Sequence, residues 1–177
     1  EFSRNVCGMA GANTTEIDPA TRFPVITILD SQKKIMEASQ YGATMRLGAY
    51  AAVVQENSLV HRLYKEKRLE KDKARLQELK KAKGEEFRLG NLQQKDIVLL
   101  ERHRHRFEVN PGFIGPLENA GMVFSGHHLK SDGTKLMEFM ELPKHPYFVG
   151  TQAHPEFKSN LEDPAPLFYG FVKAAMK

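Results

Sequence analysis

The stretch "VGTQAHPEF" (149–157) joins a run of apolar and small residues to a polar turn. The residues from 147 to 154 are typical of a buried strand, and Pro155 marks its end. His154 and Glu156 stand on either side of this proline. In open α/β sheets, ligands bind beyond the carboxyl ends of the strands. The stretch therefore predicts an α/β sheet with an ionisable pair at its rim.

The two flanking residues can do proton chemistry together. An imidazole accepts or releases a proton near neutral pH. A carboxylate two residues away can accept a hydrogen bond from one ring nitrogen, which fixes the tautomer and leaves the other nitrogen for a nucleophile. Pro155 restricts the backbone between His154 and Glu156 and so favours a fixed geometry. For the tripeptide alone, a strand-ending turn with a solvated Glu156 is the competing interpretation.

Patterns elsewhere predict further strands and helices around this one. The turn "KSDGT", with its Asp132–Gly133 pair, predicts a hairpin. Pro near the start of the last segment favours a C-terminal helix, and Gly48 allows a bulge or a close approach in its strand. We expect strands at 25–30, 44–54, 122–129, 136–142 and in the first half of 96–110, and helices at 1–8, 59–83, 111–121 and 164–177.

The positive charge of the chain is concentrated in one segment. The whole chain carries +4, whereas residues 61–84 hold ten basic and four acidic residues, so that 10 − 4 = +6 there and 4 − 6 = −2 elsewhere. Overall charge therefore does not indicate nucleic-acid binding. No run approaches the ~20 apolar residues that a membrane span needs. The single cysteine, Cys7, excludes an internal disulfide and fits a cytoplasmic protein.

The basic segment itself predicts a long helix that ends at Gly84. Leu69, Leu76 and Leu79 form only a thin apolar stripe, so we expect this helix to be mostly solvated. A role in binding a partner or RNA is the alternative. Tyr64 is the one aromatic residue among the basic residues, and interspersed acids dilute the charge. Both features argue against RNA binding.

Five segments together resemble the class I glutamine amidotransferases, and specifically the glutaminase domains of the CTP synthase family. These segments are "ANTTEIDP" (12–19), "TMRLGAY" (44–50), "ERHRHRFEVN" (101–110), "AHPEF" (153–157) and "PLFYGFVKAA" (166–175). The resemblance implies a flavodoxin-like α/β fold, an open mixed sheet flanked by helices. Residues 1–177 would form the C-terminal part of one glutaminase domain, with a charged helical insertion near 62–84.

The resemblance also implies roles for four residues in glutamine hydrolysis. His154 would be the general acid and base, and Glu156 would orient it. Glu16 would hold the amino group of glutamine, and Arg106 would lie at its carboxylate. A zwitterionic amino acid requires one anion and one cation at its backbone end, and this pair supplies both signs. For Arg46, support of a nucleotide response and buried structural pairing both stay open.

One part of the family pattern is absent from these residues. The family's nucleophilic cysteine lies in a Gly-flanked strand-to-helix turn, whereas Cys7 lies toward the far end of a predicted helix and is interpreted as a small packing residue. We therefore expect the nucleophile to lie upstream of this numbering.

The resemblance also implies an ATP- and Mg-dependent synthase domain in the same polypeptide that converts UTP to CTP, GTP as an effector, and a homotetramer. No cofactor and no metal site are expected within residues 1–177, because His103 and His105 have no third ligand at the usual spacing and His127 and His128 point to opposite faces. Two other readings remain. The chain could be the glutaminase domain of a different class I amidotransferase, or an inactive scaffold that binds through its basic helix.

Overall fold

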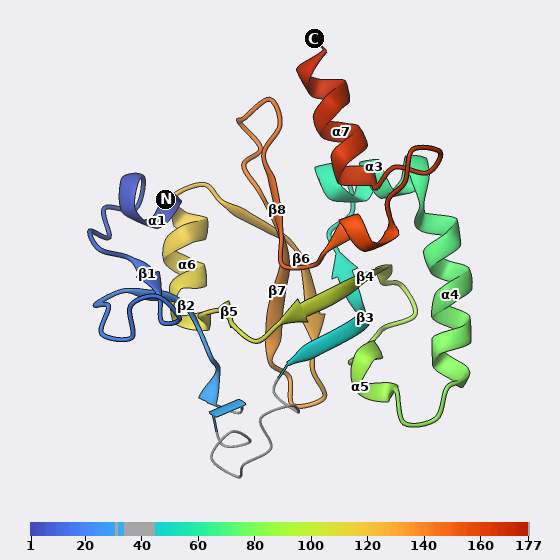
Figure 1. The fold of residues 1–177 in the computed structure, drawn as a ribbon, viewed down its shortest axis with the longest axis horizontal. Coiled ribbons are helices and arrows are strands. Elements are labelled where there is room, and N and C mark those ends of the chain that lie inside the picture. The colour runs from blue at the N-terminus through green and yellow to red at the C-terminus, as the bar shows by residue number, and fades with distance from the viewer. Residues whose placement is uncertain (31, 34–44, 177) are drawn as a thin grey trace. The chain divides into compact units, whose positions relative to one another are not determined.

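The computed structural model describes residues 1–30, 32–33 and 45–176, which form two compact units (Figure 1). Unit 1 contains Glu1–Leu47 and Arg104–Met122, and unit 2 contains Gly48–His103 and Val123–Lys177. The boundary between them falls within two strands. Thr44 and Lys177, at the ends of an expected strand and an expected helix, lie outside the described residues.

Unit 1 is built on a three-stranded sheet in the order β1-β2-β5. β2 is parallel to β1 and antiparallel to β5. A short helix, α6, follows β5 directly, because the side chain of Asn110 accepts a hydrogen bond from the Gly112 N–H at 3.0 Å and so caps the helix start. The elements are α1 (Phe2–Asn5), β1 (Asn13–Thr14), β2 (Pro24–Thr27), β5 (Glu108–Val109) and α6 (Pro111–Asn119).

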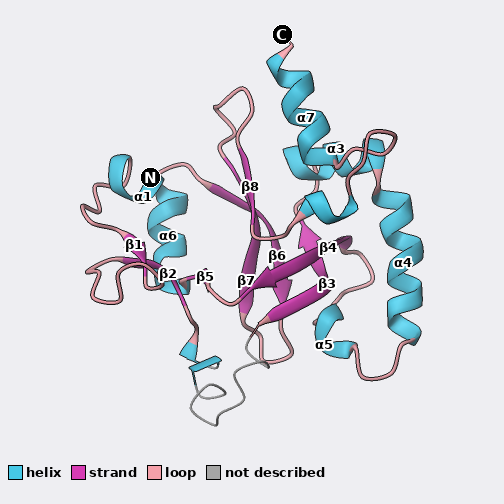
Figure 2. Ribbon diagram, viewed as in Figure 1, coloured by secondary structure: helices cyan, strands magenta, loops and turns pink. Residues whose placement is uncertain are grey.

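Unit 2 is built on a five-stranded sheet in the order β4-β3-β6-β7-β8 (Figure 2). β6 and β7 form the predicted hairpin, in which Gly133 has φ +85° and the Asp132 side chain accepts from the Thr134 N–H. β6 is also antiparallel to β3, and β7 to β8. The strands are β3 (Arg46–Val54), β4 (Ile97–His105), β6 (Val123–Leu129), β7 (Lys135–Glu141) and β8 (Val149–Thr151).

Alternate residues of β3 and β4 build two apolar clusters on opposite faces of the sheet, as the period of a strand dictates. On one face, residues such as Ala52 and Leu99 pack with side chains of α3 (Leu59–Lys67) and α7 (Pro166–Ala175). On the other face, Ala51, Val98 and Leu100 pack with Leu76 of α4 (Leu69–Lys81). The sheet is therefore covered by helices on both faces.

The long helix expected at 59–83 is in fact two helices. Arg68 separates α3 from α4 with φ −139° and ψ −13°, which are not helical angles. Its side chain is 97% covered and bonded to the backbone oxygens of Lys158 and Asp163, so tertiary contacts favour the break. α4 is mostly exposed, as predicted, but its buried face contains Asp72 in addition to Leu69 and Leu76.

Other expected boundaries need small corrections. Between the expected helix at 59–83 and the expected strand that begins at 96, the structure contains a short helix, α5 (Glu86–Leu89). Gly48 has φ +91°, and a Cβ atom there would lie 2.2 Å from the guanidinium of Arg88, which confirms the predicted close approach. β8 ends at Thr151, so His154 lies beyond the strand rather than in it. In all, the mixed sheets with covering helices confirm the predicted α/β class. Among the described residues, no helix has both the length and the apolar character needed to cross a membrane.

Candidate active site

His154 and Glu156 form a direct pair, as the sequence predicted. Nδ1 of His154 lies 2.6 Å from Oε1 of Glu156. The pair spans the start of a 3-10 helix, Pro155–Lys158, whose first residue is the buried Pro155. Both side chains remain partly exposed, at 37% and 51%. A carboxylate on Nδ1 fixes that nitrogen as the donor and leaves Nε2 to exchange a proton with a reacting group.

The backbone around the histidine is held by two strands that are not neighbours in the sheet. Gln152 donates its N–H to the oxygen of Glu138 in β7, and His154 donates its N–H to the oxygen of Arg102 in β4, at 3.1 and 2.8 Å. The segment from 152 to 154 therefore connects β7 with β4. The backbone of His154 is thus anchored to two strands, which places the imidazole more precisely than a free loop would.

An aromatic ring fixes the plane of the imidazole. Phe157 stacks on His154 with ring centroids 5.2 Å apart and an interplanar angle of 23°. On β4, the guanidinium carbon of Arg102 lies 5.8 Å from the same Phe157 ring. The stack restricts rotation of His154 and keeps its Nδ1 on Glu156.

The electrostatic state of Glu156 suits an orienting role. Burial alone would raise the pKa of Glu156, but the hydrogen bond and the charge of His154 outweigh it and lower that pKa below its ordinary value. The carboxylate therefore stays ionised throughout the neutral range. It can stabilise the imidazolium that forms when Nε2 takes up a proton.

A second histidine–glutamate pair in unit 2 is structural. Nε2 of His103 lies 3.4 Å from Oε2 of Glu138, and each side chain is only 1% exposed. Neither can meet a substrate from solvent. The "RHRHR" run alternates between the two faces of its strand, since His103 is buried whereas Arg102 and Arg104 are exposed.

Glu16 and Arg106 both belong to unit 1, where topology brings them to the same end of the β1-β2-β5 sheet. Glu16 follows the end of β1, and Arg106 precedes the start of β5. Since β1 runs parallel to β2 and β5 runs antiparallel to it, the end of β1 and the start of β5 lie at the same end of the sheet, on either side of β2. The Glu16 side chain is exposed, and the backbone oxygen of Arg106 accepts from the Gln32 side chain at 3.0 Å.

Arg46 pairs inside unit 1, which favours the structural alternative raised for it. Its guanidinium Nη1 lies 3.6 Å from Oε1 of Glu108, with side chains 8% and 0% exposed. His105 lies 3.7 Å from the same carboxylate. Among the described residues, no group of three or more His, Cys, Asp and Glu side chains is placed to hold a metal ion.

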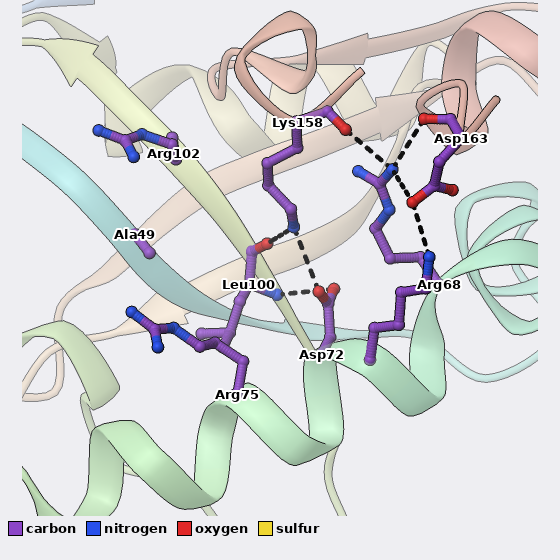
Figure 3. A pocket seen from close by; sticks show the side chains of 9 residues that line it. Ala49, Arg68, Asp72, Arg75, Leu100, Arg102, Lys158 and Asp163 are labelled. Carbon is purple, nitrogen blue, oxygen red and sulfur yellow. Dashed lines mark hydrogen bonds and ion pairs between the residues drawn. The ribbon is translucent and has the colours of Figure 1, made fainter. Parts of the chain in front are cut away.

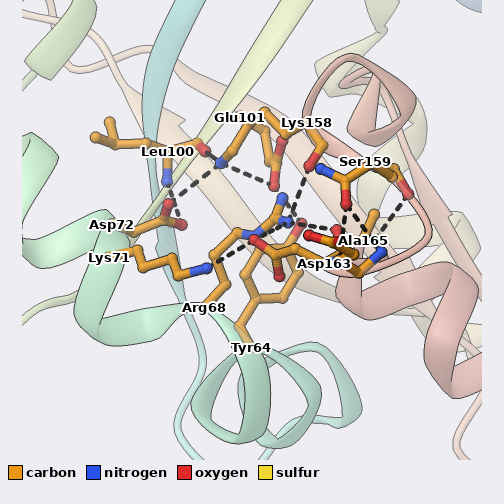
Figure 4. A network of polar contacts seen from close by, with 12 residues as sticks. Tyr64, Arg68, Lys71, Asp72, Leu100, Glu101, Lys158, Ser159, Asp163 and Ala165 are labelled. Carbon is orange, nitrogen blue, oxygen red and sulfur yellow. Dashed lines mark hydrogen bonds and ion pairs between the residues drawn. The ribbon is translucent and has the colours of Figure 1, made fainter.

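The segment that follows His154 and the helix α4 together line a pocket of about 360 Å³ (Figure 3). A network of polar contacts also joins them (Figure 4). Lys158 Nζ lies 3.2 Å from Asp72 and 3.3 Å from Glu101 and also donates to the backbone oxygen of Leu100. Asp72 accepts the N–H of Leu100 at 3.1 Å. Because β4 is at the edge of its sheet, these side chains satisfy backbone groups that would otherwise lack partners.

Sequence reasoning missed this network. Asp72 and Lys158 are 86 residues apart, and Arg68 and Asp163 are 95 apart. Nothing local marks these residues, because each reads as a charged residue of a helix or a loop. The one available signal was Asp72 itself, an acid on the same helical face as Leu69 and Leu76, four residues before the latter.

Comparisons with known proteins agree with the geometry. The family model described as glutamine amidotransferase class-I matches residues 36–174. Proteins named CTP synthase from Thermococcus gammatolerans and Methanocaldococcus jannaschii are each 43% identical over 175 and 176 residues, 99% of this chain. The chain spans only 26% of the length of either relative.

A solved structure is similar over nearly the whole chain. It is described as the glutaminase domain of Trypanosoma brucei CTPS with bound acivicin. The TM-score is 0.73 and the sequence identity 29%, over 99% of this chain and 54% of that one. The order of elements described above is therefore that of a known glutaminase domain.

Proposed function

The chain belongs to the class I glutamine amidotransferase family, and we propose that it forms part of the glutaminase domain of a CTP synthase. In this proposal the glutaminase hydrolyses glutamine to glutamate and ammonia. A synthase domain of the same polypeptide then uses ammonia and ATP to convert UTP to CTP. The observation that carries the proposal is the 2.6 Å contact between His154 and Glu156 in a chain whose relatives carry the CTP synthase name.

The proposed reaction assigns a proton-transfer role to His154. A cysteine thiolate attacks the side-chain amide carbon of glutamine, and the imidazolium gives its Nε2 proton to the leaving ammonia. The resulting thioester is then hydrolysed by a water molecule whose proton His154 accepts. Glu156 stabilises the imidazolium and holds Nδ1 as the donor.

We propose that the thiolate comes from residues outside this numbering. Cys7, the single cysteine of the chain, follows the short helix α1 and lies in unit 1. Nucleophilic cysteines of this kind depend on a strained turn beside a base, and the described non-glycine residue with positive φ is Asn57, not Cys7.

We further propose that Glu16 binds the α-amino group of glutamine and that Arg106 binds the α-carboxylate. Both residues lie at the same end of the β1-β2-β5 sheet, which supports the assignment, and their opposite charges match the two charged groups of a zwitterion. GTP activation, a homotetramer and a cytoplasmic location complete the proposal, by analogy with the family.

The test replaces His154 in the intact protein. We expect His154→Ala to lower glutamine hydrolysis by a factor of about 10³ or more, since both proton transfers lose their carrier. CTP formation from added ammonia should persist, because that reaction bypasses the glutaminase. His145→Ala is the matched control, since His145 is an exposed histidine of the loop before β8. Full glutamine turnover in His154→Ala would exclude this proton carrier.

A further inference from the structure

The pocket between α4 and the edge strand β4 has a marked excess of positive charge. Its floor includes Ala49 and Leu100 from the two strands. Five cations and two carboxylates line it, which leaves 5 − 2 = +3, namely Arg68, Lys71, Arg75, Arg102 and Lys158 with Asp72 and Asp163. All nine lining residues lie in unit 2.

The two aspartates engage three of these cations. Asp163 pairs with Arg68 at 3.2 Å and with Lys71 at 2.7 Å. Asp72 pairs with Lys158 at 3.2 Å. Lys158 also lies 3.3 Å from Glu101, a carboxylate outside the pocket lining. Three carboxylates therefore compensate these three cations, and the remaining positive charge is on Arg75 and Arg102.

Arg75 and Arg102 direct their guanidinium groups to the same end of the pocket, on either side of Ala49 (Figure 3). Arg75 pairs with Glu78 on the surface of α4, but those side chains are 68% and 65% exposed, and such a pair contributes little. The Phe157 ring lies beside the Arg102 guanidinium, so the N–H groups around that plane remain available. The small side chain of Ala49 leaves the space between the two arginines unfilled.

We propose that this pocket binds the phosphate group of a small phosphorylated molecule, with Arg75 and Arg102 on the phosphate oxygens. The planar fork of a guanidinium matches phosphate with two parallel hydrogen bonds. The volume of about 360 Å³ is at the lower end of the range for small-molecule sites and exceeds what a single phosphate fills. The apolar surface of Ala49 and Leu100 would contact the organic part of the ligand.

The proposal does not rest on glutamine hydrolysis, although Arg102 lies beside the Phe157 ring that stacks on His154. Arg75 belongs to α4, within residues 61–84, the segment that holds the chain's excess of positive charge. The concave shape favours a small ligand over a nucleic acid, which requires an extended basic track with stacking aromatic residues.

The test measures hydrogen exchange in the intact protein with inorganic phosphate, with ribose 5-phosphate, and with chloride at equal ionic strength. We expect the phosphate compounds to slow exchange in residues 69–81 and 97–103 at millimolar concentration. Protection by inorganic phosphate alone would identify a free-anion site, and stronger protection by ribose 5-phosphate would identify a site for a phosphorylated metabolite. Either result supports the proposal.

Variants locate the binding. We expect Arg75→Gln to lower the affinity for the phosphate compounds, measured by this protection, at least tenfold. Arg102→Gln, on the opposite side of the pocket, should lower the affinity by the same factor. Lys80→Gln removes an equal charge from an exposed position of α4 and should leave the affinity unchanged. Absence of protection in both segments, equal loss in Lys80→Gln, or protection that survives Arg75→Gln would each overturn the proposal. So would binding of single-stranded RNA, in place of the small phosphates, that depends on Arg75.

Discussion

Glu101 and Glu156 are two carboxylates near the same strand whose pKa values move in opposite directions. Burial raises the pKa of Glu101, which accepts from the Tyr64 O–H at 2.7 Å and lies 3.3 Å from Lys158. For Glu156, burial is outweighed by its contact with His154, and the pKa falls. The deeply buried carboxylate therefore belongs to the structural network, and the exposed one is suited to orient a catalytic base.

The raised pKa of Glu101 makes stability depend on pH. A carboxyl whose pKa is higher in the folded than in the unfolded state contributes stability that is complete below about pH 4.5 and is lost as pH rises through the folded pKa. Glu101→Gln stays neutral and lacks this loss. We expect the unfolding free energy of the wild type, relative to Glu101→Gln, to fall between pH 4 and pH 7 in guanidinium denaturation. An unfolding free energy of the wild type that increases relative to that of Glu101→Gln as pH rises would contradict this prediction.

At the scale of elements, helix α3 starts where it does because two side chains cap it. Ser58 accepts from the His61 N–H at 3.0 Å. Glu141, at the end of β7, accepts from the N–H groups of Leu59 and Val60, each at 2.9 Å. A carboxylate at a helix N-terminus satisfies free donors and interacts favourably with the helix dipole. Glu141 therefore connects the start of α3 to the sheet.

Replacing Glu141 with Gln should test this cap. The amide keeps only one acceptor and brings its NH2 group toward a backbone N–H, so we expect a loss of about 1–3 kcal/mol in unfolding free energy. The pKa of Tyr147, which burial and then the charge of Glu141 raise to about 12, should also fall in a spectrophotometric titration. Glu162→Gln, at an exposed loop position, is the control. Unchanged stability together with an unchanged tyrosine titration would refute the cap.

Asp72 is a charged residue of the largely exposed helix α4, yet its side chain is buried. Burial raises its pKa, while Lys158 and the Leu100 N–H act in the opposite direction. The residue satisfies the edge of β4 and holds the lysine that follows the candidate catalytic pair. α4 thus holds the segment that contains His154 and Glu156 through the contact between Asp72 and Lys158.

At the scale of unit 2, α4 and the sheet should unfold together. Leu76 of α4 is buried against Ala51, Val98 and Leu100 of the strands. Leu76→Ala should therefore lower the unfolding free energy by about 2–4 kcal/mol. Fully exposed Leu161→Ala should change it by less than about 0.5 kcal/mol.

Hydrogen exchange distinguishes cooperative from local loss in the same variant. If α4 belongs to the core, Leu76→Ala raises exchange in β7 (Lys135–Glu141) along with that in α4. Faster exchange limited to α4 would instead mean that the helix is a separable surface addition.

The sequence by itself determined the features that depend on neighbouring residues. Asp132–Gly133 specified the hairpin between β6 and β7. The spacing of His154 and Glu156 around a proline was enough to bring their side chains together. Such features can be predicted from the sequence because the interacting groups are at most a few residues apart and the backbone geometry between them is restricted.

Only the tertiary structure decided the features that join distant segments. The break at Arg68 and the Glu141 cap depend on partners 95 and 81 residues away. The burial of Asp72 depends on partners 28 and 86 residues away, and the basic pocket is lined by several separate segments. Local propensity predicts one continuous solvated helix, whereas packing on the sheet and satisfaction of the β4 edge favour two helices. Burial and long-range charge pairing outweigh helix propensity, which differs by less than about 1 kcal/mol between ordinary residues. The sequence pattern reflects mainly local propensity, and this is why it could not predict these long-range features.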